Sequence, residues 1–350
     1  MIDFSKYIFS EKGTAREALQ LINELAIPNI AVFVVNNQNQ LVGSLTDGDI
    51  RRGLLKGLTI DASVAVFMNT DSKCFIVGEN NFEKVKNYKD GGIRFIPEIN
   101  SDKKILRVID LEKIRSIIPA DAILMAGGKG ERLKPLTDDI PKSMLKVGDK
   151  PIIYRNIERL LKFGVNNFHI SVGHKADQIV NGLSEYDLED GVLNFIKEEK
   201  PLGTIGSAKL VKEFKNDTVL LMNSDLLTNI DFHDFYKKFV DSKADMQVAT
   251  IPYHIDVPYA VMEINDSDEV LSFHEKPRYT YYSNAGIYLF KKELIDLIPA
   301  NEPFDATHFM EVIIGEKKKL TSYPILGYWL DIGRVEDFYK AQEDVKHIHF

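Results

Sequence analysis

The most informative stretch of the sequence is a glycine-rich loop that follows a short apolar run. Gly127, Gly128 and Gly130 fall within four positions, with Lys129 between the last two. Glycine lets the backbone approach a ligand closely, and free backbone N–H groups can hold a phosphate. The spacing differs from the G-x-G-x-x-G of dinucleotide-binding folds and from the Gly-Lys-Ser/Thr ending of a P-loop. The loop therefore predicts a phosphate-bearing ligand that is held by a different type of loop.

A longer string surrounds this loop and carries a family resemblance. From Ala126 the sequence reads AGGKGERLKPLT, and Pro-Lys-Ser-Met follows at 141–144. This string resembles that of the sugar-1-phosphate nucleotidyltransferases, also called nucleoside-diphosphate-sugar pyrophosphorylases. The resemblance implies that Arg132 and Lys142 are the catalytic cations, which hold a triphosphate and stabilise the transition state. It also implies nucleotide contacts from the loop, at Ala126, Gly127, Gly128 and Gly130.

Two aspartates match the metal-binding positions of the same family. Asp225 ends the string Met-Asn-Ser-Asp after a predicted strand, and Asp331 lies in Trp-Leu-Asp-Ile-Gly. Either aspartate alone would be read as a turn residue or a helix cap. Together and in this order they imply a Mg²⁺ site, because carboxylate oxygens suit that ion and can share it with phosphate oxygens.

A third group of matches implies where the sugar phosphate binds. Glu275 and Lys276 match the family's Glu-Lys-Pro, in which the glutamate accepts from sugar hydroxyls and the lysine holds the phosphate. Asn284, in Asn-Ala-Gly-Ile-Tyr, matches an asparagine that contacts the sugar. Ala260 departs from the Tyr-Gly of many relatives. Alanine keeps the backbone N–H near the sugar, but its methyl group would narrow the pocket.

The string EEKPLGTIG at 198–206 concerns the choice of nucleotide. It resembles the Glu-x-Pro-Leu-Gly-Thr-x-Gly of guanylyltransferases for mannose- and heptose-1-phosphates, which implies nucleotide contacts from four residues: Glu198, Glu199, Gly203 and Thr204. Guanine presents two adjacent donors, N1–H and N2–H, that one carboxylate can accept together. GTP is therefore favoured. UTP is the main alternative, because some uridylyltransferases also carry a glutamate here, and CTP or dTTP follow. The structural alternative is that both glutamates are solvated surface charges.

The charges of the implied reactants indicate the reaction. A sugar-1-phosphate oxygen attacks the α-phosphorus of the triphosphate in line, and pyrophosphate leaves. Both reactants are anions, so catalysis depends on positioning and charge neutralisation, and the ionised nucleophile needs no general base. Two alternatives stay open. One is a degenerate nucleotidyltransferase that only senses nucleotides, and the other is a cytidylyltransferase for a sugar acid or a choline-phosphate-type transferase of the same fold.

The elements that must position these residues alternate along the chain from Asp121 onward. Strands are predicted at 121–126, 167–172, 192–196, 219–222 and 246–252, and helices at 151–163, 176–183, 205–214 and 231–242. This alternation predicts an α/β fold with a mixed, mostly parallel, Rossmann-like sheet and helices on both faces. The family resemblance implies its nucleotidyltransferase (GT-A-like) form. Ligands then bind at the carboxyl ends of the strands, where the glycine loop and Asp225 fall.

Residues 1–119 contain a weak internal repeat at an offset of 64 residues. The apolar run at 30–36 aligns with 94–100, and each copy, about 5–62 and 63–118, reads as a helix, a strand, a polar turn, a strand and a second helix. This resembles a tandem pair of CBS domains, known as a Bateman module. The resemblance implies a regulatory adenosine site at Thr46 and Asp49, which match ribose-binding positions.

Two observations keep that adenosine site open. The second copy has Asp110 and Lys113 at the corresponding positions, so a second site is not expected. In the first copy Thr46 can instead cap a helix, in which case the module only packs or dimerises. Because Bateman modules often pair face to face, we expect a homodimer.

Composition limits the class of protein. The 350 residues predict about two domains, of which 1–119 holds 16 basic and 15 acidic residues, and 120–350 holds 28 and 37. We place the boundary there, between the tandem CBS module at 1–119 and a nucleotidyltransferase domain at 120–350. The net charge of −8 argues against a general nucleic-acid partner.

The remaining composition predicts a cytoplasmic protein without a membrane partner. The sequence has one cysteine, Cys74, and no apolar run of the roughly 18 residues that span a bilayer. The substrates implied are a nucleoside triphosphate and a sugar-1-phosphate. The domain order resembles one group of guanylyltransferases, which forms GDP-glucosamine in the legionaminic acid pathway of surface glycans.

Overall fold

The computed structural model describes residues 4–28, 30–77, 79, 81–186, 188 and 191–348. The chain divides into two compact units, one of residues 1–119 with 162–164 and one of 120–161 with 165–350. The division falls at Pro119, where the balance of charge also changes. The outermost residues of both predicted domains, 1–3 and 349–350, lie outside the described residues.

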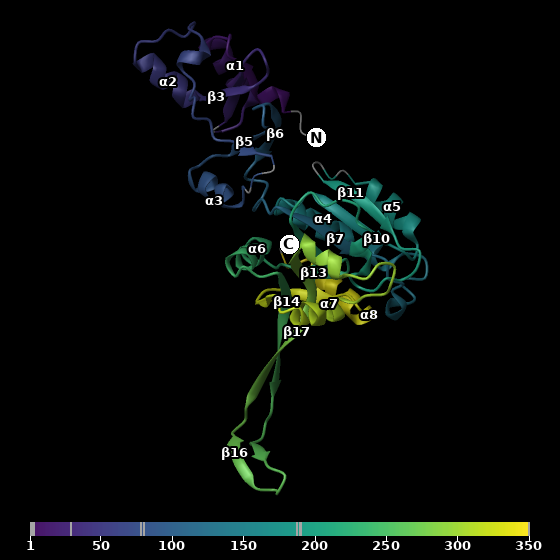
Figure 1. Ribbon diagram of the computed structural model, residues 1–350. Helices are drawn as coiled ribbons and strands as arrows, with labels where there is room; N and C mark the ends of the chain where they lie inside the picture. Colours follow the sequence, from purple (N-terminus) through teal and green to yellow (C-terminus); the bar gives the residue numbers. More distant parts are fainter. Residues whose placement is uncertain are drawn as a thin grey trace. The chain divides into compact units, whose positions relative to one another are not determined.

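The first unit contains two copies of a strand-helix-strand-strand motif (Figure 1). In each copy the first strand pairs in parallel with the second, and the second pairs antiparallel with the third. The last two strands recur at an offset of 64 residues, which confirms the predicted repeat. The copies consist of β1 (Ile8–Ser10), α1 (Ala15–Leu25), β2 (Ala31–Val35) and β3 (Leu41–Thr46), and of β4 (Phe75–Ile76), α3 (Phe82–Asp90), β5 (Phe95–Ile99) and β6 (Ile105–Asp110).

The polar turns of the two copies repeat at the level of single hydrogen bonds. Asn36 Oδ1 accepts from the backbone N–H groups two and four residues later, at 2.9 and 3.0 Å. Asn100 Oδ1 does the same at 3.1 and 2.9 Å. Asn39 and Lys103, again 64 residues apart, have φ of 59° and 62°. An asparagine that bonds its own backbone favours a turn, so both copies close their strand pair in the same way.

The predicted closing helix forms in the first copy only. There α2 (Asp47–Leu55) follows β3, with Thr46 as its N-cap. After β6 the chain instead makes a turn, in which Asp110 Oδ1 accepts from the N–H of Glu112 at 3.0 Å. Lys113 stands where the first copy has a carboxylate, and an ammonium group cannot accept the hydrogen bond that completes a capping box. The prediction of a helix after β6 was therefore wrong.

The second unit is built on a seven-stranded sheet of order β11-β10-β7-β12-β17-β14-β18. All neighbours are parallel except that β17 runs antiparallel to both β12 and β14, which confirms the mixed, mostly parallel α/β sheet. The strands are β7 (Ala120–Met125), β10 (Asn167–Val172), β11 (Val192–Lys197), β12 (Thr218–Asn223), β14 (Met246–Asp256), β17 (Arg278–Lys291) and β18 (Leu320–Pro324).

Helices flank this sheet and two short strand pairs complete the unit. Phe309 and Ile313 of one helix belong to the same core as Ile123 and Val248 of the sheet. None of the described helices combines the length and apolar character needed to cross a membrane. The helices are α4 (Ile152–Lys162), α5 (Ala176–Ser184), α6 (Phe232–Asp241), α7 (Ala306–Gly315) and α8 (Val335–Asp344); the pairs are β8 (Lys146–Val147) with β9 (Lys150–Pro151), and β13 (Leu226–Thr228) with β19 (Trp329–Asp331).

The helix predicted at 205–214 is only a short 3₁₀ helix, Gly206–Leu210. Its surroundings explain the difference. The chain is already extended at Val211, with φ of −67° and ψ of 121°, and the Asp121 carboxylate then accepts from the backbone N–H groups of Lys215 and Asn216, at 2.6 and 3.2 Å. A Cβ at Gly206 would also lie 3.0 Å from the carbonyl oxygen of Glu302. Ile205 and Ala208 still belong to the core, but in a tighter and shorter turn than predicted.

One part of the second unit leaves the sheet. The outer halves of β14 and β17 continue as a two-stranded ribbon, and β15 (Val261–Ile264) pairs with β16 (Val270–His274) at its end (Figure 1). We call residues 251–283 the arm. At its base the β14–β17 register shifts between Val248 and Thr250, and Gly286 has φ of 72°. β14 is therefore longer than predicted, because the sequence pattern ends where the ribbon leaves the core.

Candidate active site

The glycine loop starts directly after β7, at the carboxyl end of a central strand. Gly130 has φ of 65°, and a Cβ there would lie 3.0 Å from Lys142 Cβ, so only glycine fits without strain. The Thr137 hydroxyl donates to Gly130 O at 2.8 Å, and Lys175 Nζ donates to Thr137 O at 3.0 Å. Hydrogen bonds from Thr137, which Lys175 holds in turn, thus fix the turn that we expect to bind phosphate. Gly128 has open space where a Cβ would lie, which leaves its backbone accessible.

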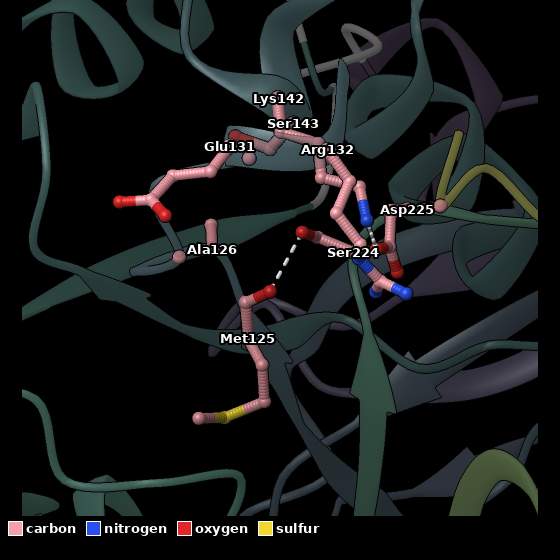
Figure 2. Close-up of a pocket in the computed structure, with 11 residues that line it drawn as sticks. Met125, Ala126, Glu131, Arg132, Lys142, Ser143, Ser224 and Asp225 are labelled. Carbon is pink, nitrogen blue, oxygen red and sulfur yellow. Dashed lines mark hydrogen bonds and ion pairs between the residues drawn. The ribbon is translucent and has the colours of Figure 1, made fainter. Parts of the chain in front are cut away.

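This loop forms one wall of a pocket of about 370 Å³ (Figure 2). The end of β12 and the segment around 141–143 also line the pocket. Of the predicted residues, the pocket collects Ala126, Gly128, Gly130, Arg132, Lys142 and Asp225. Residues separated by about 100 positions therefore meet at one edge of the sheet, as the α/β fold predicts.

The two predicted cations enter the pocket from two 3₁₀ helices, Glu131–Leu133 and Lys142–Met144. The Lys142 ammonium pairs with Asp225 Oδ2, and both side chains are largely buried, at 17% and 16% exposed. In Figure 2 the Arg132 guanidinium also turns toward Asp225, whereas Glu131 points the other way. Positive charge is therefore concentrated beside the carboxylate, on one side of the pocket.

The two predicted metal aspartates are adjacent because β13 and β19 pair. Leu226 lies opposite Asp331 in that pair, and Ile332 N donates to Asp225 O at 3.2 Å. Burial raises the pKa of Asp331, and the nearby Asp225 carboxylate raises it further, while Lys142 and Arg132 oppose the change. Two carboxylates that disfavour each other's charge are a typical arrangement where a cation binds.

The donor set of these aspartates fits a divalent cation. Asp225 Oδ1 and Asp331 Oδ1 are both buried and have no hydrogen-bond partner. Such orphaned oxygens cost free energy unless another group satisfies them. The described residues offer no cluster of three or more His, Cys, Asp or Glu side chains for a metal. An ion at this pair would take its other ligands from water and phosphate oxygens, which is the usual way in which Mg²⁺ binds.

Several residues of the pocket were not assigned a role from the sequence: Met125, Glu131, Ser143, Ser224 and Gly333. Ser224 Oγ donates to Met125 O at 2.6 Å, which ties the end of β12 to the end of β7. Ser143 Oγ is buried without a hydrogen-bond partner. Ser143 directly follows Lys142 in the Pro-Lys-Ser string, so that string could have indicated it as a further residue of the pocket lining.

Glu198 and Glu199 lie in different surroundings. The Glu198 carboxylate stands beside the glycine loop, with its Oε1 3.0 Å from where a Cβ of Gly127 would be. It accepts from the Ser171 hydroxyl, and its Oε2 accepts from Leu202 N at 3.1 Å. Glu199 is exposed. The fold thus brings the first glutamate, and not the second, to the predicted nucleotide loop.

Gly203 and Thr204 make structural contacts with the start of α7. Gly203 has φ of 74°, and a Cβ there would lie 2.7 Å from Phe304 O. Thr204 Oγ1 accepts from Ala306 N at 2.7 Å, and Thr204 N donates to Asp305 Oδ1 at 3.0 Å. These bonds fix the loop of 198–206 to the helix. A nucleotide contact from either residue stays a prediction.

The four predicted sugar residues are not in the pocket. Asn284 lies at the base of the arm, where its Nδ2 donates to the Tyr288 hydroxyl at 2.8 Å and its Oδ1 accepts from Gly286 N at 2.9 Å. Ala260, Glu275 and Lys276 lie farther out on the arm, and the last two are exposed. The pocket therefore brings together six of the predicted nucleotide, catalytic and metal residues, whereas none of the four predicted sugar residues lines it.

In the first unit, Thr46 and Asp49 are bonded to each other. Asp49 Oδ2 accepts from Thr46 N at 2.9 Å and from the Thr46 hydroxyl at 2.6 Å, and Thr46 Oγ1 accepts from Asp49 N at 3.2 Å. This reciprocal capping box starts α2, as one of the two predicted roles requires. A ribose contact from the same pair stays a prediction.

Comparison with known proteins covers the second unit. The profile of the nucleotidyl transferase family matches residues 121–347. A mannose-1-phosphate guanyltransferase of Debaryomyces hansenii is 35% identical over 229 residues, which are 62% of each chain. A UTP–glucose-1-phosphate uridylyltransferase of Synechocystis is 27% identical, covering 63% of this chain and 62% of that one. The chain thus spans about three fifths of the length of the curated relatives that it matches.

A solved structure is similar over the same region. HddC from Yersinia pseudotuberculosis, in complex with GMP-PN, matches 65% of this chain and 99% of its own, at 29% identity and a TM-score of 0.51. The residues that form the pocket all lie within the matched family region.

Proposed function

The chain belongs to the nucleotidyl transferase family, and we propose that its second unit joins a nucleotide to a sugar-1-phosphate and releases pyrophosphate. The observation that carries this proposal is the pocket. Its lining brings the glycine loop together with Arg132, Lys142 and Asp225, and the neighbouring Asp331 adds a second buried carboxylate with an unsatisfied oxygen. Those groups suit a reaction between two phosphate anions better than any chemistry that requires a general base.

The bond changes follow from the charges of the reactants. An oxygen of the sugar-1-phosphate forms a bond to the α-phosphorus, while the bond from that phosphorus to the bridging β-phosphate oxygen breaks. Pyrophosphate leaves with the electron pair, and no proton has to move because the attacking oxygen is already ionised. The backbone N–H groups of the loop orient the triphosphate, and Arg132 can donate to two phosphate oxygens at once.

Lys142 and the carboxylate pair supply the rest of the charge balance. The Lys142 ammonium lies beside Asp225, just after the carboxyl end of β12, where it can neutralise a phosphate as a point charge. Asp225 and Asp331 would hold Mg²⁺. When bound, that ion would neutralise phosphate oxygens and draw the two anions together.

The nucleotide that we propose is GTP. Support comes from Glu198, whose carboxylate is fixed beside the glycine loop and retains acceptor capacity for the two adjacent donors of guanine. The guanyltransferase relatives and the GMP-PN complex agree with this choice. The uridylyltransferase relative keeps UTP as the alternative.

The acceptor that we propose is a hexose- or hexosamine-1-phosphate, with Glu275, Lys276, Asn284 and Ala260 contributing the sugar half of the site. Formation of GDP-glucosamine for surface glycans is the specific case that the domain order suggests. Ala260, Glu275 and Lys276 lie on the arm and Asn284 lies at its base, so productive binding requires these residues to approach the sugar end of the bound substrate.

For the first unit we propose a regulatory tandem CBS module that binds an adenosine nucleotide near Thr46 and Asp49. A cavity of about 310 Å³ supports this role. It lies between one end of α1 and the start of α2, where Asp47 forms part of its lining. A ribose there would have to compete with, or add to, the capping bonds of this pair.

Pyrophosphate release with each of four nucleoside triphosphates and a set of sugar-1-phosphates tests the proposal. Glu198→Gln should lower kcat/KM for GTP by about 10- to 100-fold and reduce the preference over UTP, since an amide cannot accept both guanine donors. Glutamine can still bond Ser171 and Leu202. Glu199→Gln is the matched control and should leave the preference unchanged. Equal effects of the two variants would refute guanine recognition by Glu198.

A further inference from the structure

A second cleft lies in the same unit as the catalytic pocket. Its volume is about 800 Å³, against about 370 Å³ for that pocket, and no described residue lines both. The strands β10 and β11 line this cleft together with the segment 210–215, which begins at the end of the 3₁₀ helix Gly206–Leu210. A concave site of this size is large enough to hold a small molecule.

Polar side chains form a hydrogen-bonded network on the strand face that lines the cleft. Asn167 and His169 are two residues apart on β10, and Asn194 of β11 is paired with His169, so the three side chains share one face. Asn167 Nδ2 donates to Asp121 Oδ1 at 3.1 Å, and Asn167 Oδ1 accepts from Asn194 Nδ2 at 3.2 Å. Because the carboxylate needs a donor, these bonds fix the orientation of the Asn167 amide.

This network leaves His169 with one donor for the cleft. His169 is only 5% exposed, and its Nε2 lies 3.2 Å from Asn167 Nδ2. Since that amide nitrogen is a donor, Nε2 must accept, which places the ring proton on Nδ1. Over the part of the chain that the structure describes, no group accepts from Nδ1. A buried N–H group is normally satisfied, so this donor indicates an acceptor that comes from outside the chain.

The protonation state of His169 agrees with that reading. Burial lowers the pKa of His169, and the Lys215 ammonium lowers it further, although the Asp121 carboxylate opposes the change. The ring is therefore neutral at pH 7, with a single proton to donate. The influence of Lys215 on the ring also shows that this cation lies near the donor.

The charges around the cleft favour an anion. Lys197, Lys212 and Lys215 line it, against a single carboxylate, that of Glu213. Among the described residues, none of the three lysines has an ion-pair partner. Residues 120–350 as a whole have the opposite balance, with 28 basic and 37 acidic residues. The excess of cations is therefore a local property of the cleft, and it raises the local concentration of anions.

Apolar side chains complete the lining. Ile196, two residues after Asn194, is buried on the same face of β11, and Val211 packs against the core from the segment 210–215. An inorganic ion would leave these side chains without a contact. The lining therefore suits a molecule that combines an anionic group with an apolar part.

We propose that this cleft binds a small organic anion. A phosphate or carboxylate oxygen of the ligand accepts from His169 Nδ1, the lysines neutralise its charge, and its apolar part packs on Ile196 and Val211. The proposal does not depend on the proposed catalytic function, because the cleft and the catalytic pocket have separate linings.

Isothermal titration calorimetry of the full-length protein tests the site with four probes: phenyl phosphate, benzoate, inorganic phosphate and benzyl alcohol. The first two carry different anionic groups on the same ring, inorganic phosphate lacks the ring, and benzyl alcohol lacks the charge. We expect phenyl phosphate or benzoate to bind with a Kd of about 1 mM or below, and the two incomplete probes to bind about tenfold more weakly or less. The tighter of the two organic anions identifies the anionic group.

Variants then locate the binding. Lys212→Ala combined with Lys215→Ala alters two exposed side chains and should raise the Kd of the organic anion about tenfold, with pyrophosphate release in the absence of the probe unchanged. His169→Phe keeps a ring but removes the donor and should raise the Kd similarly. If this change at a buried position prevents folding, the lysine variant still decides. Lys142→Ala, in the catalytic pocket, is the control and should leave the Kd unchanged.

Three results would overturn the proposal. Neither organic anion binds, or inorganic phosphate binds as tightly as phenyl phosphate. Alternatively, the Kd rises in Lys142→Ala but not in the lysine double variant, which would place the anion in the catalytic pocket.

Discussion

At the pocket, Arg132, Lys142 and Asp225 line one space and Asp331 lies close enough to feel their charges, whereas on the arm Glu275 and Lys276 are exposed to solvent. The pocket residues come from the ends of paired strands and from turns that hydrogen bonds fix. The arm residues depend on two strands that leave the sheet at a register shift. Both regions belong to the same unit, and each carries residues that match a different motif of the same family.

This difference indicates where the molecule is preorganised. Catalysis by charge neutralisation needs fixed donors at the place where charge develops, and the pocket supplies them before any ligand binds. A residue that only binds the substrate can instead reach its position after the substrate has entered the site, provided that other contacts then hold it there. The arm is built in this second way, so changes in the pocket should mainly affect turnover and changes on the arm should mainly affect binding.

The largest effect is expected from Lys142→Ala. Loss of the ammonium removes the point charge beside Asp225 and should lower kcat by about 100- to 1000-fold, as for other preorganised donors at a transition state. Initial rates of pyrophosphate release at saturating substrates measure it, and circular dichroism checks the fold. Lys146→Ala, which alters an exposed lysine of β8, is the control. Near-normal turnover in Lys142→Ala would contradict the view that the pocket residues act on turnover and the arm residues on binding.

Asp331→Asn should also lower turnover, by about 100-fold, because a metal ligand is lost. Its effect on stability should have the opposite sign. Burial and Asp225 raise the pKa of Asp331, which means that folding disfavours the ionised form, so a neutral amide of the same shape removes that cost.

Thermal unfolding in the presence of a chelator should therefore show a higher Tm for Asp331→Asn than for the unchanged protein at pH 7. A lower Tm without metal would mean that Lys142 and Arg132 already compensate both carboxylates. The fit of the pair to a cation would then lose its main physical support.

Lys276→Ala should act on binding rather than on turnover. Loss of one charge-assisted bond to the sugar phosphate should raise KM for the sugar-1-phosphate about tenfold, with kcat and the KM for the nucleotide nearly unchanged. Arg278→Ala, two residues along the arm and paired with Asp256, is the matched cation control. If Lys276→Ala lowers kcat as far as Lys142→Ala does, the arm belongs to the preorganised site and the comparison fails.

The smallest effect concerns Thr46, whose partner Asp49 is already bonded to it. Thr46→Ala should destabilise the first unit by about 1 kcal/mol, the usual cost of a lost N-cap, and Thr14→Ala, which removes the equivalent box of α1, should cost about the same. Urea unfolding of the full chain measures both. Calorimetric titration with ATP and AMP then separates the roles, since only Thr46→Ala should weaken adenosine binding. Identical nucleotide binding in both variants would leave Thr46 as a cap.

Several residues of the pocket could be predicted from the sequence because short stretches of the chain determine their positions. The turn at Gly130 has a positive φ, which favours glycine, and Asp225 follows an apolar strand whose carboxyl end lies at the ligand edge of the sheet. The adjacency of Asp225 and Asp331 could be inferred only from the family, since it rests on a strand pairing across about 100 residues.

The rest depended on tertiary contacts that periodicity does not encode. The segment after Ile205 has helical spacing, but the chain becomes extended at Val211 and its next backbone N–H groups, at Lys215 and Asn216, donate to the Asp121 carboxylate. The closing helix of the second copy fails at Lys113, whose charge is wrong for a cap. The alternation of apolar and polar residues along β14 and β17 predicts strands, but it does not show whether other strands or solvent cover them. The arm was therefore not predicted.

Phosphorus NMR of one reaction mixture tests most directly whether the protein transfers a nucleotide to a sugar-1-phosphate. The full-length protein is incubated with GTP, a hexose-1-phosphate and Mg²⁺, and the α-phosphorus resonance is followed alongside that of pyrophosphate. We expect one nucleotide-sugar and one pyrophosphate for each triphosphate consumed, and no conversion when either substrate or the cation is omitted. Pyrophosphate or GMP formed without a nucleotide-sugar, or no conversion with any nucleoside triphosphate and sugar-1-phosphate, would contradict nucleotidyl transfer in this pocket.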